Sequence, residues 1–333
     1  MPDGMATFTV LDGRWYPTSA GWLPGFPERD YHRGLMLLDY DGTETPEESL
    51  SYSRAKLLIP PSTPERFRGH VQKPSDELDF GKIAHRRVLG VGADYEVLPA
   101  TGWKTKTGEE AEKPAATKEY KARKAEIEAA GRTPISEADM AVIEAMEKRL
   151  RGHSTALDYL TGDGDAEVSM WAQDPVIGCW LRGRVDYWNR ARKTFVDYKT
   201  VGVELGAAPE NANKTIYKNR YYLQAAWYLT LGLRVGIDVE DFVFILQEKD
   251  PPYQVSTISI NFEFLSLGMD VMRMVIDRWA ACMESGQWEG YPDEVVTVGP
   301  PPYAYSSVSP VAGLVSDELD AELRSYASQE KGI

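Results

Sequence analysis

The sequence predicts an α/β fold, built as one large domain with extensions. The chain has 333 residues, of which 43% are hydrophobic, and this is enough for one large core or two modest ones. Two pairs of apolar, β-rich runs flank short turns, the first pair over 180–200 and the second over 241–260. Helical segments follow each pair, over 217–232 and 262–286. We expect these strands and helices to share one core.

Four segments are expected along the chain. Residues 1–48, rich in Gly, Pro, Trp and Tyr, predict an irregular N-terminal arm, and residues 49–291 form the main domain. Residues 292–315 read as a Pro-rich linker, and 316–333 as an amphipathic C-terminal helix. The narrow apolar stripe of this last helix suits docking on its own domain, on another subunit or on a partner.

The composition of the chain argues against a secreted or membrane-spanning protein. No basic N-terminal region precedes an apolar run, and no stretch approaches the roughly 18 apolar residues of a membrane span. Cys179 and Cys282 have no metal-ligand spacing and suit buried thiols in a reducing compartment. We therefore expect a cytoplasmic protein with no membrane association.

The net charge of −14 at first argues against a nucleic-acid partner. The distribution of charge matters more, because residues 182–220 hold nine Lys and Arg against four Asp and Glu. An acidic exterior around a basic channel is compatible with DNA passing through the protein. The alternative is a solvated hairpin with surface arginines.

The first strand pair carries the most informative side chains. Trp180–Trp188 and Thr194–Thr200 predict two strands joined at 189–193. Alternation places Asp197 and Lys199 on one face, and a paired register brings Asp186 beside Asp197. Buried charges are costly unless they are paired or hold a metal. A plain Asp197–Lys199 ion pair on a solvated face is the alternative.

A helix about 25 residues later carries Gln224 and Tyr228 on one face, at i and i+4. Together, the segments GRVD, VDYK and QAAWY resemble the core motifs of the PD-(D/E)XK nuclease superfamily, and more closely the RecB-type motif that ends in Q-x-x-x-Y. This resemblance implies a restriction-endonuclease-like core, in which helices flank a mixed central β-sheet.

Upstream, the segment FGKIAHRRVLG places His85 on a predicted helix. It resembles the first motif of the RecE-like exonucleases of the exodeoxyribonuclease VIII type, which act in phage recombination. That resemblance implies that His85 supports the metal site. It also implies that Glu167, on the strand before the hairpin, joins the acidic cluster, although an edge-strand Glu is most simply a solvated residue.

The resemblance also implies a mechanism. Mg²⁺, or Mn²⁺ as an alternative, would be held by Asp186, Asp197, the backbone carbonyl of Tyr198 and His85. Lys199 would orient or deprotonate the attacking water, while Gln224 and Tyr228 would position DNA or Lys199. The expected DNA contacts are basic or hydroxyl side chains near the motifs, namely Arg184, Arg192, Lys214, Lys218, Arg220, Ser53 and Arg54.

The expected function is a metal-dependent exonuclease that resects linear double-stranded DNA ends from 5′ to 3′. It would leave a 3′ strand for a single-strand-annealing protein and would form a trimer or tetramer. One alternative is a structure-selective or restriction-type endonuclease of the same superfamily, which would cleave closed circular DNA. Another is a non-catalytic DNA-binding protein, which would bind DNA tightly without Mg²⁺.

Overall fold

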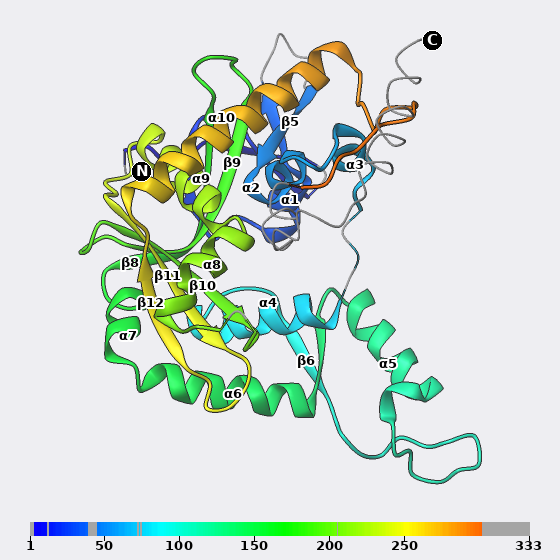
Figure 1. Ribbon diagram of the computed structural model, residues 1–333. Coiled ribbons are helices and arrows are strands. Elements are labelled where there is room, and N and C mark those ends of the chain that lie inside the picture. Colours follow the sequence, from blue (N-terminus) through cyan, green and yellow to red (C-terminus); the bar gives the residue numbers. More distant parts are fainter. Residues whose placement is uncertain are drawn as a thin grey trace, which may run out of the picture. The chain divides into compact units, whose positions relative to one another are not determined.

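A mixed eight-stranded sheet lies at the centre of the described fold (Figure 1), in the order β12-β11-β10-β9-β5-β4, with β8 also pairing β9 and β3 pairing β8. The computed structural model describes residues 3–301 except 12, 39–44, 72, 74 and 205. The strands of this sheet are β3 (Gly21–Pro24), β4 (Leu35–Leu38), β5 (Thr45–Ser51), β8 (Gly164–Gln173), β9 (Trp180–Asn189), β10 (Thr194–Val201), β11 (Asp241–Glu248) and β12 (Val255–Ser259).

Both predicted hairpins are present. β9 and β10 pair antiparallel, as do β11 and β12. β10 and β11 pair parallel, which requires a crossover connection. That connection contains helices α8 (Ala212–Lys218) and α9 (Tyr221–Arg234). The sheet is therefore mixed, as expected from the sequence.

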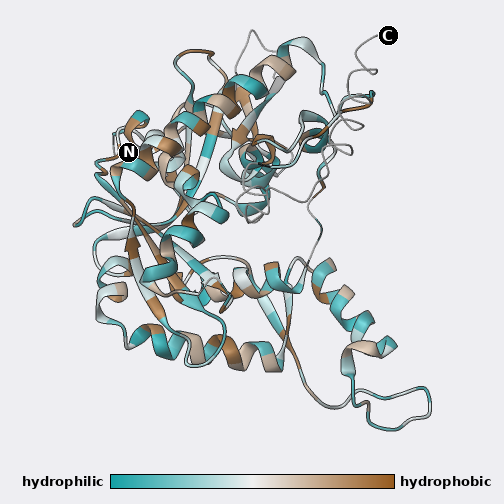
Figure 2. Cartoon of the chain, viewed as in Figure 1, coloured by the Kyte–Doolittle hydropathy of each residue, from teal (hydrophilic) through white to brown (hydrophobic). Residues whose placement is uncertain are grey.

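Helices cover both faces of the sheet. The remaining helices are α1 (Glu28–Arg33), α2 (Tyr52–Ala55), α3 (Pro64–Gly69), α4 (Asp76–Leu89), α5 (Lys118–Ala129), α6 (Glu137–Arg151), α7 (Ser154–Leu160) and α10 (Phe262–Ser285), with 3₁₀ turns η1 (Lys56–Leu58), η2 (Pro114–Ala116) and η3 (Pro209–Asn211). α9 and α10 pack on one face with Phe195 and Phe242, whereas α4, α6 and α7 pack on the other with Val196 and Tyr198. Figure 2 shows the brown strands between these helices.

Strand alternation explains the division of the core. Phe195 faces the α9 side and Val196 faces the α4 side, because neighbouring residues of a strand point to opposite faces. Asp197 and Lys199 follow Phe195 in this alternation. Both charged side chains of β10 therefore belong to the α9 face, as the sequence pattern predicts.

The N-terminal segment differs from the irregular arm expected for residues 1–48. It forms β1 (Phe8–Leu11), β2 (Arg14–Pro17), β3, α1 and β4, and β3 pairs antiparallel with β8. The physical reason is burial: Trp22, Phe26 and Met36 are buried, so this segment contributes to the core.

Residues 95–136 form a smaller substructure. β6 (Tyr95–Leu98) and β7 (Thr133–Ser136) pair parallel, and α5 lies between them in sequence. Chain contacts divide the protein into Met1–Gly290 and Tyr291–Ile333, and every element above lies in the first unit. The helix predicted for 316–333 falls outside the described residues. Among the described helices, none has the length and apolarity needed to cross a membrane.

Candidate active site

The two strands of the central hairpin separate at the acidic residues. β9 and β10 pair at three positions, from Asn189 opposite Thr194 to Tyr187 opposite Val196, and the ladder then stops. Asp186 and Asp197 would form the next pair. Instead, the backbone N–H of Tyr198 donates a 2.8 Å hydrogen bond to Oδ2 of Asp186. A side-chain carboxylate thus replaces a ladder acceptor at the point of divergence.

Asp197 is almost completely buried, with 1% of its surface exposed, and both of its oxygens have polar neighbours. Oδ1 forms an ion pair with Nζ of Lys199, and Oδ2 accepts a 2.6 Å hydrogen bond from Nε2 of Gln224. Burial and the nearby Asp186 carboxylate raise the pKa of Asp197 to about 6. The predicted metal ligand Asp197 is thus engaged by the chain's own cation and amide.

Helix α9 brings Gln224 and Tyr228 to the site, as their i, i+4 spacing predicts. Both side chains are buried, and Gln224 and Lys199 contact the two oxygens of the same carboxylate, that of Asp197. The ring of Tyr228 packs against Gly183, where an added Cβ would lie 2.9 Å from the ring. Glycine in the GRVD motif therefore allows α9 to approach β9 closely.

His85 reaches the site from α4. Its Nδ1 lies 3.3 Å from Oδ2 of Asp186, and its ring meets that of Tyr198 edge-on at 5.3 Å. Burial, followed by the charge of Lys199, lowers the pKa of His85 to about 4. The imidazole is therefore neutral at physiological pH and is a competent metal ligand.

Glu167 occupies an unusual position on β8. The β8–β9 register places it opposite Asp186, yet this is the one pair missing between Gly164 and Gln173. Its φ of 53° lies in the left-handed region, which costs a non-glycine residue on the order of 1–3 kcal/mol. Burial and the Asp186 carboxylate raise the pKa of Glu167 to about 8. Backbone strain and a raised carboxyl pKa coincide at this residue.

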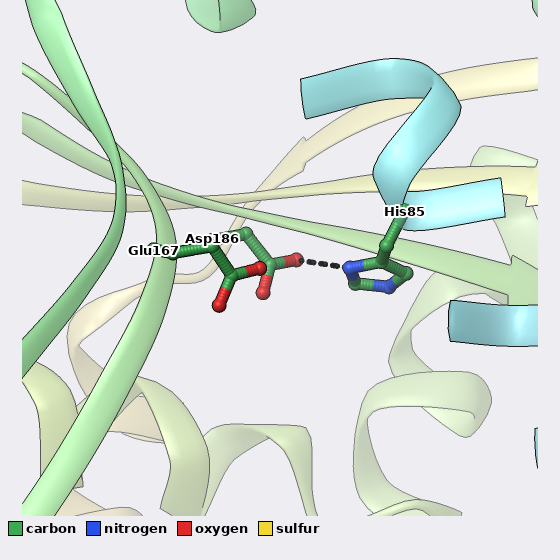
Figure 3. A group of neighbouring side chains, drawn as sticks. All are labelled: His85, Glu167 and Asp186. Carbon is green, nitrogen blue, oxygen red and sulfur yellow. Dashed lines mark ion pairs between the residues drawn. The ribbon is translucent and has the colours of Figure 1, made fainter. Parts of the chain in front are cut away.

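These three side chains form one group, shown in Figure 3. His85, Glu167 and Asp186 each offer one ligand atom, and these atoms lie within 4.8 Å of one another. Two carboxylates and a neutral imidazole suit a divalent cation, which would offset the cost of burying the two charged carboxylates that raises their pKa values. Burial raises the pKa of Asp186 as well. The donor set therefore fits a divalent metal.

The surroundings of Lys199 favour its charged form, whereas those of His85 favour the neutral form. Burial lowers the pKa of its ammonium, but the carboxylates of Asp197 and Asp186 more than offset burial, so the pKa is raised. The Lys199 Nζ also lies 5.5 Å from the centre of the Tyr221 ring. In this arrangement Lys199 carries a positive charge, which suits the stabilisation of negative charge in the adjoining cavity.

Two cavities meet at this group. One, of about 780 Å³, is lined by residues of α1 and α4 together with His85, Glu167, Arg184 and Asp186. The other, of about 310 Å³, is lined by Lys56, Asp197, Lys199, Tyr221 and Gln224, among others. Ser53, Asp186 and Tyr228 line both cavities. The acidic group and Lys199 therefore line two adjoining cavities.

The predicted DNA contacts separate into two groups. Ser53 lines both cavities, and Arg184 lines the larger one, where it is fixed by Ser169 Oγ at 2.8 Å and the Phe26 carbonyl at 2.6 Å. Five others line neither cavity, although each is at least partly exposed: Arg54, Arg192, Lys214, Lys218 and Arg220.

Two of the predicted contacts point elsewhere. Arg192 pairs with Asp158 at 3.2 Å, because the hairpin turn faces α7 rather than the divergent end of the strands. Arg54 lies over the Phe67 ring at 4.2 Å, since its position on α2 directs it towards α3. Both placements depend on tertiary packing, and neither residue touches the cavities.

Sequence reasoning missed Lys56 and Tyr221, which line the smaller cavity. A signal was present for each: Lys56 follows Ser53 at i+3, and Tyr221 precedes Gln224 at i−3. Residues at these spacings share a helical face. Lys56 is therefore expected on the same face as Ser53, and Tyr221 on the same face as Gln224.

Comparison with known proteins supports this fold. Residues 103–296, which are 194 of the chain's 333 residues, match the family described as a PDDEXK-like domain of unknown function, DUF3799. The match includes Glu167, Asp186 and Asp197 but not His85. None of the curated proteins compared with the chain matches it.

One solved structure shares this fold. A candidate exonuclease from Eubacterium rectale has 14% identity and a TM-score of 0.50, covering 78% of this chain and 93% of its own. The structure of SSO0001 also has 14% identity and covers 63% of this chain and 82% of its own, but its TM-score of 0.24 is too low to indicate a shared fold. The predicted restriction-endonuclease-like fold is thus confirmed, and the chain belongs to the PDDEXK-like family DUF3799.

Proposed function

We propose that this protein is a divalent-metal-dependent deoxyribonuclease that degrades linear double-stranded DNA from its ends. The observation that carries this proposal is the group of His85, Glu167 and Asp186 beside the Lys199–Asp197 pair. Mg²⁺ is the proposed metal, with Mn²⁺ as an alternative, because carboxylate oxygens are its preferred protein ligands.

The chain's own residues have distinct parts in this proposal. A divalent cation bound at the group supplies charge stabilisation for the phosphate and a water of lowered pKa. Asp186 and Glu167 supply negative ligands, and His85 supplies a neutral one. The Lys199 ammonium faces the smaller cavity and stabilises negative charge developing on the phosphate. Gln224 fixes Asp197, which in turn fixes Lys199.

The RecE-like resemblance also suggests the polarity of degradation, its product and the oligomeric state. We infer resection from 5′ to 3′, production of a 3′ strand for a single-strand-annealing partner, and assembly into a trimer or tetramer. Support comes from the FGKIAHRRVLG segment, whose His85 lies 3.3 Å from Asp186. An endonuclease of the same superfamily would use the same residues.

The test uses linear duplex DNA with 5′ phosphates, the same DNA as a closed circle, and Mg²⁺. Loss of the linear form alone, absent in Asp197→Ala and Lys199→Ala, is the expected result, and labelling each end then gives polarity. Cleavage of the circle would establish an endonuclease instead. If both variants cleave like the wild type, or the wild type cleaves neither DNA, the proposed catalytic assignment is wrong.

A further inference from the structure

A basic surface lies beside the site, on the segment from α2 to the residues after α3. Residues 52–73 contain five Lys and Arg against one Glu, in a chain whose net charge is −14. Of these basic residues, Lys56, Arg66, Arg68 and Lys73 are exposed, and so is His70. The charge of this segment therefore contrasts with that of the whole chain.

Part of this surface is concave. A cavity of about 720 Å³ is lined by Arg66, His70 and Lys73 together with Leu57, Ser62, Gly69 and Val71. Among these described lining residues there is no carboxylate. A concave surface that combines basic side chains, a hydroxyl and exposed backbone suits an anionic polymer better than an apolar ligand.

The surface continues from the site. Ser53 and Lys56 line the smaller cavity at the catalytic group, and the next residue, Leu57, lines the basic concavity. The two hollows thus border the same short segment, α2 and η1. A polyanion whose phosphate lies at Lys199 can cross this segment to reach Arg66 and Lys73.

The segment is also fixed in place. The rings of Phe67 and Trp288 stack with their centroids 5.5 Å apart, and Arg54 lies over the Phe67 ring and Arg68 over the Trp288 ring. Arg278 of α10 donates hydrogen bonds to the carbonyls of Leu58, at 2.7 Å, and Ser62, at 3.1 Å. A rigid basic surface loses less entropy on binding than a mobile one.

We propose that the 52–73 surface binds the phosphate backbone of the DNA that flanks the cleaved end. This proposal rests on the proposed function for the identity of the polymer, and it assigns affinity to α2–α3 rather than to Arg192. The contacts are with the backbone and carry no sequence information.

The test is DNA binding by the full-length protein in EDTA, so that no hydrolysis occurs. Arg66→Gln/Lys73→Gln is compared with Lys148→Gln/Arg149→Gln, an exposed pair on α6 that lines none of the three cavities described above. Both variants lose the same charge. Loss of two phosphate contacts lowers the salt-dependence slope by about 1.8 and weakens binding to a labelled duplex on the order of tenfold or more near physiological salt.

The outcomes are distinct. Binding that falls in the first variant, stays unchanged in the α6 variant and is restored by Arg66→Lys/Lys73→Arg supports the surface. Equal affinity and salt slope in both Gln variants overturns it, even if the wild type hydrolyses DNA. If Arg66→Gln/Lys73→Gln weakens DNA binding but the wild type degrades no DNA with Mg²⁺, the proposed nuclease function is wrong and the DNA-binding surface is still supported.

Discussion

The backbone N–H of Tyr198 donates to the Asp186 carboxylate over 2.8 Å, at the position where β9 and β10 would otherwise continue their ladder. This one contact joins the motif's first aspartate to its second strand. It also leaves the same Oδ2 within 3.3 Å of His85. The divergence of the hairpin and the convergence of His85 and Asp186 therefore share an atom.

Substitution of Asp186 should separate its structural and catalytic parts. Asp186→Asn retains an acceptor for Tyr198 and should unfold at a denaturant concentration close to that of the wild type. Asp186→Ala leaves the Tyr198 N–H without that acceptor and should lose about 1–3 kcal/mol of stability. Both should lose nuclease activity by orders of magnitude. Urea unfolding and a DNA degradation assay measure the two effects, and an active Asp186→Asn variant would contradict the assignment.

Gly183→Ala should destabilise the protein by about 1–3 kcal/mol, through overpacking. An added Cβ would lie 2.8 Å from Cδ1 of Leu231 and 2.9 Å from the Tyr228 ring. The second substitution Leu231→Val should restore part of the loss in urea unfolding. Gly81→Ala, on α4 with no atom within 4 Å of the new Cβ, is the control and should be neutral or stabilising.

Gln224→Ala should reduce activity about 10–100-fold, since it removes a hydrogen bond that orients Asp197. The effect should fall on kcat more than on DNA affinity, because Gln224 is buried and its amide is hydrogen-bonded to the Asp197 carboxylate. Steady-state kinetics on linear duplex DNA gives the two parameters. A change confined to KM would show that Gln224 acts on DNA directly.

Metal-free stability should depend on pH through Glu167. Its folded pKa of about 8 lies above the ordinary value, so the folded state binds the proton more tightly than the unfolded state does. Stability in EDTA should therefore fall as pH rises from about 5 to 8, by a contribution that Glu167→Gln lacks. The measured quantity is the difference in unfolding free energy between the two proteins across this range. A difference that does not vary with pH would contradict the shift.

Mn²⁺ should stabilise the wild type against thermal unfolding, by about 2.7 kcal/mol at a concentration one hundred times its dissociation constant. Glu167→Gln and Asp186→Asn should lose most of this stabilisation, since each removes one negative ligand from the group. Asp197→Asn should lose less, because its oxygens contact Lys199 and Gln224. Equal losses in all three variants would place Asp197 in the metal shell as well.

Several features were readable from the sequence. The bounds of β9 and β10 agree with the predicted strands to within one residue at each end, because alternating apolar residues and a five-residue polar turn specify a hairpin. The shared face of Asp197 and Lys199 follows from the two-residue period of a strand. The i, i+4 spacing of Gln224 and Tyr228 follows from helical geometry. Each of these depends on residues close together in the chain.

Other features required the fold. The abundance of Gly, Pro, Trp and Tyr in residues 1–48 predicts an irregular arm. The structure instead contains strand β3 there, which pairs with β8, about 150 residues later in the chain. The basic residues Arg54 and Arg192 are turned away from the cavities by Phe67 and Asp158. Local sequence specifies neither partner.

The sequence by itself determined the identity of the acidic and basic motif residues, the hairpin that carries them and the helix that follows. Tertiary structure alone decided that His85, Glu167 and Asp186 converge, and that Asp197 is held by Lys199 and Gln224. The physical reason is the range of the interactions. The side-chain alternation of a strand or helix is set by residues a few positions apart. The convergence of His85, Glu167 and Asp186 depends instead on the packing of α4 against the sheet and on the left-handed backbone conformation of Glu167 in β8.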